Sequence, residues 1–372
     1  MAEILFEDVT RRRGHGPPAV SGLSLRVAQG ELLALLGPSG SGKSTVLRLA
    51  AGLERPTSGT VRFDGRDVDE MDPADRDVAM VFQDGGLYSH QDVRGNMGFA
   101  LRLRRMLRPE IDRRVQAEAR ALGLEQLLGR RPGTLSAGQR QSVALGRAAV
   151  RVPAAYLLDE PLANVDGPQR ARMRAELARL QRGLGVTTLY ATNDQGEAMA
   201  LGDRLAVLDG GVLHQLETPQ RVYDRPVNRT VAEFVGTPAM NVVAASVDRD
   251  AEGDWLVLGG QRVLLTRRVP APAWRAARVL VGLRPERLRD AGSGPRPHPR
   301  RVLFARADTV TSEGWALLVG LTLVGSGAHL VTRLPTGGRL RAGDRMEVAV
   351  DTGHVHLFDA VTGDALWHAA AP

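Results

Sequence analysis

Residues 37–45 have the composition of a loop that could bind phosphate. The segment reads Gly37, Pro38, Ser39, Gly40, Ser41, Gly42, Lys43, Ser44 and Thr45. It fits the pattern GxxxxGK[ST], in which glycines let backbone N–H groups converge on phosphate oxygens at a helix N-terminus. We expect Lys43 to bridge the β- and γ-phosphates of a nucleoside triphosphate, Ser44 to hold Mg²⁺, and Thr45 to support the loop.

The sequence around this loop favours a phosphate site over an ordinary turn. Residues 31–36 are predicted to form a buried strand, and residues 44–51 a helix without Gly or Pro. Of the 49 Lys and Arg residues only Lys43 is a lysine, and the other 48 are arginines. The chain therefore keeps its single ammonium side chain where phosphate binding asks for one.

Two adjacent carboxylates follow a second apolar strand, predicted over residues 155–160. Asp159 and Glu160 stand at its C-terminal end, where open α/β sheets bind ligands. We expect Asp159 to hold Mg²⁺ directly or through water, and Glu160 to orient or deprotonate an attacking water molecule. The alternative is an exposed acidic turn after a buried strand.

A third segment, Leu-Ser-Ala-Gly-Gln at residues 135–139, opens a predicted helix that runs to about Val150. Ser136 and Gln139 also have the spacing of a helix capping box, so locally the segment could be purely structural. The order of the motifs along the chain favours a functional role for this segment. The phosphate loop comes first, then Gln83 after a predicted strand at 78–82, then this segment, then the acidic strand end.

The elements after the carboxylates are predicted from their apolar spacing. Met173, Leu177, Leu180 and Leu184 recur at helical intervals, which predicts a helix packed on the sheet and assigns these residues to the core. Gly185 ends that helix. A strand predicted over residues 186–191 then leads into Thr192, Asn193 and Asp194.

Composition limits the class of protein. With 372 residues and 43% apolar content, two or three folded domains are expected. No apolar run approaches the roughly 20 residues that cross a bilayer, and the acidic start of the chain is unlike a secretory signal, which predicts a cytoplasmic protein. Absence of Cys excludes disulfides and thiolate chemistry. The net charge of +7 is dispersed, so no nucleic-acid partner is expected.

Together these motifs resemble the ATP-binding subunits of ABC importers of the carbohydrate type, the maltose and glycerol-phosphate importer family. The resemblance covers almost the whole chain. It implies an α/β P-loop NTPase (RecA-like) cassette over residues 1–235 with an inserted α-helical subdomain at about 86–150. It implies a C-terminal β-barrel (OB-like) regulatory domain over residues 236–372.

Three segments carry the C-terminal part of the resemblance: 236–241 (Gly-Thr-Pro-Ala-Met-Asn), 282–286 (Gly-Leu-Arg-Pro-Glu) and 356–359 (His-Leu-Phe-Asp). Independently of it, short alternating segments such as 255–258 and 345–350, with Gly and Pro between them, predict a small β-barrel. Residues 290–300 are rich in Pro, Gly and Arg and are expected to form a loop.

The resemblance also implies how the protein works. Two ATPase subunits would hold MgATP between the phosphate loop of one and Ser136, Ala137, Gly138 and Gln139 of the other, with Gln83 at Mg²⁺ and the attacking water. Asp166 would communicate across the dimer, and residues 87–96 would dock a membrane subunit. The implied partners are a second ATPase subunit, two transmembrane permeases and an extracytoplasmic solute-binding protein. The implied location is the cytoplasmic face of the cell membrane.

Several positions depart from the family pattern. Asn193 stands where the family has a switch histidine, and an uncharged, shorter donor there predicts slow hydrolysis with nucleotide binding retained, since losing one such donor costs about 10² to 10³ in rate. Near the N-terminus the family has an aromatic residue that stacks on adenine. This chain instead has Arg13, together with Arg11, Arg12 and His15. A guanidinium plane can also stack on a base. Ala137 replaces a Gly, and Ser142 an Arg.

Three alternatives remain at this point. The first is an ATP-dependent clamp that dimerises but barely hydrolyses ATP, or a degenerate partner of a more active ATPase. The second keeps the importer and changes its cargo to polyamine, iron, sulfate or phosphonate. The third, a soluble ABC protein of DNA repair or translation, is disfavoured because the chain carries neither a long coiled coil nor two cassettes.

Overall fold

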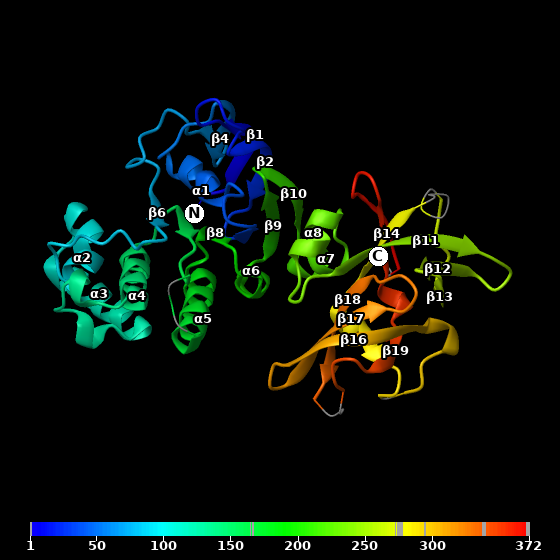
Figure 1. Ribbon diagram of the computed structural model, residues 1–372. Helices are drawn as coiled ribbons and strands as arrows, with labels where there is room; N and C mark the ends of the chain where they lie inside the picture. The colour runs from blue at the N-terminus through cyan, green and yellow to red at the C-terminus, as the bar shows by residue number, and fades with distance from the viewer. Residues whose placement is uncertain are drawn as a thin grey trace. The chain divides into compact units, whose positions relative to one another are not determined.

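The chain forms two compact units, Met1–Pro219 and Gln220–Pro372 (Figure 1). The structure is a computed structural model that describes residues 2–163, 165, 167–271, 273, 278–293, 295–336 and 340–369. Within these residues no helix is both long and apolar enough to cross a membrane.

The first unit is built on a six-stranded sheet of order β10-β9-β3-β8-β7-β6. Its strands are β3 (Leu32–Leu36), β6 (Val78–Val81), β7 (Ala155–Asp159), β8 (Thr187–Thr192), β9 (Arg204–Asp209) and β10 (Val212–Glu217). All neighbours pair in parallel except β10, which pairs antiparallel with β9 at the edge. Every residue of β3, β7 and β8 is buried, which explains why these strands, apart from the terminal Asp159 of β7, consist of apolar residues and threonines.

A smaller antiparallel sheet covers one face of α1 (Lys43–Ala51). Its order is β2-β1-β4-β5, with β1 (Ile4–Arg11), β2 (Val20–Val27), β4 (Ser58–Phe63) and β5 (Arg66–Asp67). The α1 residues Val46, Leu47 and Leu49 are almost fully buried in one cluster with side chains of both sheets. The helix after the phosphate loop is therefore fixed on both sides, which holds the loop rigid.

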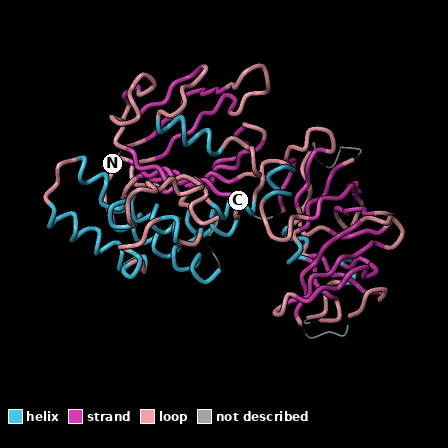
Figure 2. Tube along the Cα trace, turned by 60° about the vertical axis from the view of Figure 1, so that its left-hand side comes forward, coloured by secondary structure: helices cyan, strands magenta, loops and turns pink. Residues whose placement is uncertain are grey.

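The remaining helices of this unit lie on the other side of the six-stranded sheet, and Figure 2 shows them gathered there. They are α2 (Val93–Leu103), α3 (Arg108–Leu122), α4 (Ala137–Ala149), α5 (Gly167–Leu184) and α6 (Gln195–Leu201), with 3₁₀ turns at Glu125–Leu127 and Pro132–Thr134. Of the predicted core stripe, Met173 and Leu177 are buried and Leu184 is partly buried, which confirms that prediction. The side chain of Leu180 lies outside the described part.

Among its described residues, the second unit consists of β-strands, two short α-helices, α7 (Pro219–Asp224) and α8 (Arg229–Phe234), and 3₁₀ turns at Pro285–Arg287, Pro299–Arg301 and Thr352–His354. Two sheets, of order β13-β12-β11-β14-β20-β21 and β15-β19-β16-β17-β18, share one apolar core and form a nearly closed barrel. The strands are β11 (Asn241–Arg249), β12 (Asp254–Leu258), β13 (Gln261–Leu264), β14 (Val279–Leu283), β15 (Leu288–Asp290), β16 (Val302–Ser312), β17 (Ala316–Leu323), β18 (His329–Pro335), β19 (Arg345–Val350), β20 (His356–Asp359) and β21 (Ala365–His368). The predicted barrel is thus confirmed.

Asn241, the last residue of the segment 236–241, links the two sheets of the barrel. Its Nδ2 donates to the carbonyls of Leu283, at 2.9 Å, and Val331, at 2.8 Å, and its Oδ1 accepts from the Val331 N–H at 2.6 Å. Leu283 belongs to β14 and Val331 to β18. A buried amide that satisfies backbone groups of two sheets fixes their relative position.

Arg284, within the segment 282–286, anchors the two short helices to the barrel. Its guanidinium donates to the carbonyls of Tyr223 (2.7 Å), Ala232 (3.4 Å) and Val235, and lies over the Tyr223 ring at 3.9 Å from its centroid. The side chain is 2% exposed, and burial lowers the pKa of Arg284. By contacts, α7 and α8 therefore group with the second unit, whereas the sequence placed the domain boundary after residue 235.

Replacing Arg284 with methionine should destabilise the second unit markedly. The change would leave three buried carbonyls without their donor, so we expect the free energy of unfolding to fall by about 3 kcal/mol. Thermal unfolding measures it. Arg229→Ala is the matched control, because Arg229 is an exposed residue of α8 paired with Glu233, and its loss should cost less than about 0.5 kcal/mol. Equal stability of the two variants would contradict the anchoring role.

Candidate functional site

The predicted site residues follow the C-terminal ends of four neighbouring parallel strands. The phosphate loop follows β3, Asn193 follows β8, Glu160 follows β7 and Gln83 follows β6. Because these strands are adjacent in the order β3-β8-β7-β6, residues far apart in the sequence meet at one sheet edge. This is the edge where α/β sheets bind ligands.

Lys43 folds back over its own loop. Its Nζ donates to the carbonyl of Gly37 at 2.8 Å and to that of Pro38 at 2.9 Å, and the residue is 4% exposed. Burial lowers the pKa of Lys43, while the nearby charges of Glu160 and Asp159 act in the opposite direction. The loop is therefore already curled around the ammonium group that would meet phosphate.

Glycines of the loop stand where a side chain would collide with backbone. A Cβ at Gly37 would lie 2.1 Å from the Leu208 carbonyl oxygen, and one at Gly42 would lie 2.4 Å from that of Ala19. Gly42 also has a φ of 101° as the residue before α1, which is strained for any other residue type. The Ser41 hydroxyl is buried and has no hydrogen-bond partner in the described part of the chain. The close backbone contacts at the glycines and the unpaired Ser41 hydroxyl both fit a loop that binds phosphate.

The carboxylates and their partners form two short contacts beside the loop. Ser44 Oγ donates to Asp159 Oδ1 at 2.8 Å, and Gln83 Nε2 donates to Glu160 Oε2 at 3.3 Å. Asp159 is 5% exposed. Burial raises the pKa of Asp159, and the hydrogen bond from Ser44 partly offsets that rise. The structure thus brings the predicted metal ligands and the predicted base together.

Glu160 has a backbone conformation that is unusual for its type. Its φ is 44°, in the left-handed region, and its N–H donates to the Ala191 carbonyl at 2.9 Å. Strain of this kind concentrates at functional sites. Because Asp159 pairs with Ala191, Asn193 follows that pair by two residues at the same edge, and it is exposed.

The turn that carries Asn193 is held firmly. Asp194 caps α6 by accepting from the Glu197 N–H at 3.0 Å, and its own N–H donates to Thr192 Oγ1 at 3.0 Å. Glu197 is buried and accepts from the hydroxyls of Tyr190 at 2.8 Å and Thr192 at 2.9 Å. The backbone at the switch position is therefore fixed before nucleotide arrives.

Ser136 and Gln139 form the capping box that their spacing allows. Ser136 Oγ accepts from the Gln139 N–H at 3.2 Å, and Gln139 Oε1 accepts from the Ser136 N–H at 3.0 Å. Ala137 and Gly138 are the first residues of α4. The segment thus bonds to itself rather than to the phosphate loop of its own chain. Asp166, predicted to communicate across a dimer, lies outside the described residues.

Arg13 lies beside the start of α1. Its Nη2 is 3.5 Å from Thr45 Oγ1 and it pairs with Glu54, which also accepts from Arg11 Nε at 3.0 Å. Arg48 Nη1 is 3.6 Å from the same carboxylate. Glu54 was not predicted as a site residue. The sequence around Glu54 shows only an acid with arginines nearby. Its contact with Arg13 spans 41 residues, so it could not be inferred from neighbouring residues.

The donor set fits Mg²⁺ held jointly with a nucleotide. No group of three or more His, Cys, Asp and Glu side chains suited to a metal occurs among the described residues. Ser44 and Asp159 supply oxygen ligands 2.8 Å apart, and Gln83, which contacts the adjacent Glu160, carries an amide oxygen as a further ligand group. Mg²⁺ prefers oxygen ligands and is commonly held by one or two carboxylates together with substrate phosphates. The residues present therefore fit a phosphate-dependent magnesium site.

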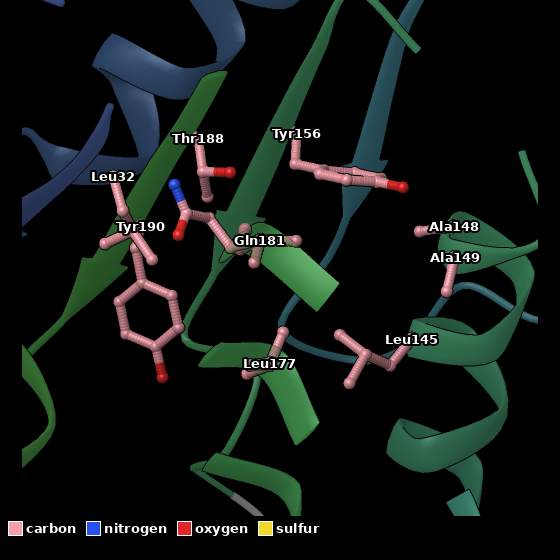
Figure 3. Close-up of a pocket in the computed structure, with 10 residues that line it drawn as sticks. Leu32, Leu145, Ala148, Ala149, Tyr156, Leu177, Gln181, Thr188 and Tyr190 are labelled. Carbon is pink, nitrogen blue, oxygen red and sulfur yellow. The ribbon is translucent and has the colours of Figure 1, made fainter. Parts of the chain in front are cut away.

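An apolar cavity elsewhere in the first unit has a different character (Figure 3). It lies between the six-stranded sheet and α4 and α5, and its lining includes Leu145, Leu177 and the rings of Tyr156 and Tyr190. The two tyrosine hydroxyls already donate, to the Arg151 carbonyl at 2.9 Å and to Glu197 at 2.8 Å. With its polar atoms satisfied, this cavity offers nothing to a charged nucleotide.

Comparison with known proteins gives consistent matches. A family model described as "ABC transporter" matches residues 20–163. The sn-glycerol-3-phosphate import ATP-binding protein UgpC of Cereibacter sphaeroides is 45% identical, covering 98% of this chain and 100% of that protein. The trehalose/maltose import ATP-binding protein MalK of Thermococcus litoralis is 43% identical, covering 99% and 100%. The solved dimeric structure of the bacterial ABC transporter cassette MJ0796 is 28% identical, with a TM-score of 0.55, and covers 58% of this chain and 98% of that one.

Proposed function

The chain belongs to the ABC transporter family, and we propose that two copies of its cassette close on two ATP molecules to drive solute import through separate membrane subunits. It is an ATPase of the importer type. One observation carries the proposal: Lys43, the Ser44–Asp159 pair and the Gln83–Glu160 pair meet at one sheet edge.

Each residue of this cluster has a chemical role in the proposal. Lys43 and the loop N–H groups hold the triphosphate, and Ser44 and Asp159 would hold its magnesium ion. When bound there, Mg²⁺ would supply charge neutralisation for the phosphoryl group being transferred. Gln83 orients the Glu160 carboxylate through its amide, and Glu160 positions the attacking water and accepts its proton. Asn193 donates a hydrogen bond towards the γ-phosphate.

Closure of two cassettes on each other is supported by the segment at residues 135–139, whose polar groups bond within the segment. Ser136 and Gln139 form a rigid, capped helix start, and a helix N-terminus attracts anions. The solved cassette MJ0796 is dimeric. We propose that this helix start meets ATP held by the phosphate loop of a second ATPase subunit, and that Asp166 contributes at the same interface. ATP would then join the two cassettes.

A groove at the side of the first unit suits a helix of a permease. It has a volume of about 320 Å³ and its lining includes Leu53, Phe82, Tyr88 and Phe99; the first and third of these are 49% and 37% exposed. Arg147 reaches across it and donates to the Gly86 carbonyl at 2.6 Å. Gln83 is adjacent in the chain to Phe82, so a partner in this groove would be coupled directly to the catalytic site.

The loop that borders the groove is shaped by one buried side chain. Asn96 Oδ1 accepts from the Tyr88 N–H at 2.8 Å, and its Nδ2 donates to the carbonyls of Tyr88, Gln91 and Asp92 at 3.0 to 3.2 Å. The residue is fully buried. We propose that this rigid loop, within residues 87–96, is the contact for the membrane subunits. Through this contact the protein would be held at the cytoplasmic face of the membrane.

The proposed cargo is a carbohydrate or a sugar-like phosphate ester. UgpC relatives are named for sn-glycerol-3-phosphate import, and others for trehalose or maltose import. The full importer would also contain two permeases and an extracytoplasmic solute-binding protein, which select the cargo. Identification of the subunits that copurify with this chain would separate a carbohydrate importer from one for polyamine or iron.

Restoring a histidine at position 193 tests the clamp alternative. Asn193→His should raise the steady-state ATPase rate of the assembled transporter by about 10- to 100-fold if Asn193 limits hydrolysis, because a charged donor stabilises the γ-phosphate better in the transition state. The wild-type assembly should still hydrolyse ATP above background. No hydrolysis by the wild type, with strong hydrolysis by the variant, would favour the ATP-dependent clamp.

A nearby substitution controls for local disturbance. Gln195→His places an imidazole two residues later, in the first turn of α6, and should leave the rate unchanged. An equal rate in wild type and Asn193→His would contradict a rate-limiting role for position 193. In that case the rate measured for the wild-type assembly would still establish that the protein is an ATPase.

A further inference from the structure

A cavity in the second unit is lined by basic residues that the proposed function does not use. Its volume is about 310 Å³, within the range of small-molecule sites. It lies beside β15 and β19 and the 3₁₀ turns Pro285–Arg287 and Pro299–Arg301. Its charged and polar lining consists of Glu286, Arg287, Arg289, His298, Arg301 and Asp351.

The two carboxylates of this lining already have partners. Asp351 accepts from Arg287 Nη1 at 3.3 Å and from His354 Nδ1 at 2.8 Å. Glu286 accepts from the Tyr223 hydroxyl. Three arginines face two acids, which leaves one formal positive charge in excess. The cavity therefore has spare positive charge rather than spare negative charge.

Arg301 is the arginine of this lining with an unsatisfied buried donor. Its Nε is buried, and no described residue accepts a hydrogen bond from it. Arg289, by contrast, donates to the carbonyls of Ser293 at 3.0 Å and Pro295 at 2.8 Å. A buried cationic N–H without an acceptor costs free energy. In a native protein such a group calls for an explanation, and a bound water or ion is one of them.

His298 adds a further donor to the same lining. Its Nδ1 accepts from the Arg300 N–H at 3.2 Å, so in the neutral ring the proton resides on Nε2. The lining thus combines guanidinium donors from two turns with an imidazole N–H from the residue before the second turn. Donors from several backbone segments suit a tetrahedral oxyanion, whose three oxygens point in different directions, better than a planar carboxylate.

We propose that this cavity binds the phosphate group of a small metabolite, with Arg301 as the principal contact and Arg287 and His298 as supporting donors. The volume leaves room for a few carbon atoms beside the phosphate. The site belongs to the second unit and is separate from ATP binding in the first. The second unit would then sense a phosphorylated compound, or phosphate itself, while the cassette hydrolyses ATP.

Isothermal titration of the full chain tests the proposal with four probes: glycerol phosphate, inorganic phosphate, glycerol and glycerate. The phosphate loop also takes phosphate, so the titrations use Lys43→Ala as the background. Glycerol phosphate should bind with a dissociation constant in the micromolar to millimolar range, and uncharged glycerol should not bind. Tighter binding of the ester than of inorganic phosphate would identify a phosphorylated metabolite as the ligand of this cavity. The reverse order would identify inorganic phosphate as the ligand.

Arg301→Gln on that background should weaken binding at least tenfold, because it removes the charge and keeps much of the side-chain volume. Arg300→Gln is the matched control: Arg300 lies on the same turn, is paired with Glu252 and is not part of the lining, so affinity should be unchanged. Thermal unfolding verifies that both variants are folded. Equal affinity in the two variants, no binding of either phosphate probe, or glycerate binding as tightly as glycerol phosphate would overturn the proposal.

Discussion

Lys43→Ala is expected to lower the affinity for ATP by about 100-fold or more and to abolish solute uptake with it. Charge-assisted hydrogen bonds to phosphate are among the strongest in proteins, and a buried ammonium that loses them typically costs several kcal/mol of binding. The same change removes the donor to the Gly37 and Pro38 carbonyls, so the empty loop would also lose its shape. Fluorescent nucleotide binding measures the effect.

Arg55→Ala is the charge-matched control for this prediction. It removes one cation from the same unit, but Arg55 is exposed and paired with Glu70, so ATP affinity should change by less than about twofold at moderate salt. Unchanged affinity in Lys43→Ala would refute the assignment of the phosphate loop. A loss of affinity in both variants would point to long-range charge rather than to a specific site.

Glu160→Gln is expected to lower the hydrolysis rate by about 10² to 10⁴ while ATP still binds. The amide keeps the size of the side chain but cannot accept a proton from water. The expected decrease in rate is the range typical of the loss of a general base. Removing a negative charge near Lys43 should leave ATP affinity equal or slightly higher. ATP should therefore accumulate unhydrolysed in a paired form of the protein.

Single-turnover hydrolysis and light scattering with MgATP measure these two effects. Glu31→Gln is the control: Glu31 precedes β3 at the opposite edge of the same sheet and pairs with Arg204, so hydrolysis should be unaffected. Rapid hydrolysis by Glu160→Gln would assign the catalytic base elsewhere. Failure to pair while retaining ATP would contradict the closure mechanism but not the catalytic assignment.

The strand-and-loop frame of the site was predictable because its signals are local. The buried strands β3 and β7 stand out as apolar runs, and each ends within one residue of the position that the sequence predicts. The helix α1 begins at Lys43, one residue earlier than predicted, because Gly42 takes a left-handed conformation before it. The capping box at Ser136 and Gln139 is equally local and forms as its spacing indicates.

Contacts between distant residues were not predictable in the same way. The pairing of Gln83 with Glu160 spans 77 residues, and its geometry depends on β6 and β7 being neighbours. Glu54 meets Arg13 across 41 residues. Arg284 reaches carbonyls 49 to 61 residues away. Nothing in the sequence near these residues shows which backbone groups lack donors.

The arginine anchor of α7 and α8 has a consequence for dividing the chain. A cassette ended at residue 235 would carry both short helices away from the guanidinium that satisfies their final carbonyls. It would expose the Tyr223 ring, and it would leave a cation enclosed in the remaining barrel without acceptors. A cut after Pro219 keeps every one of these contacts within one fragment. A polypeptide divided there is therefore expected to be more stable than one divided after residue 235.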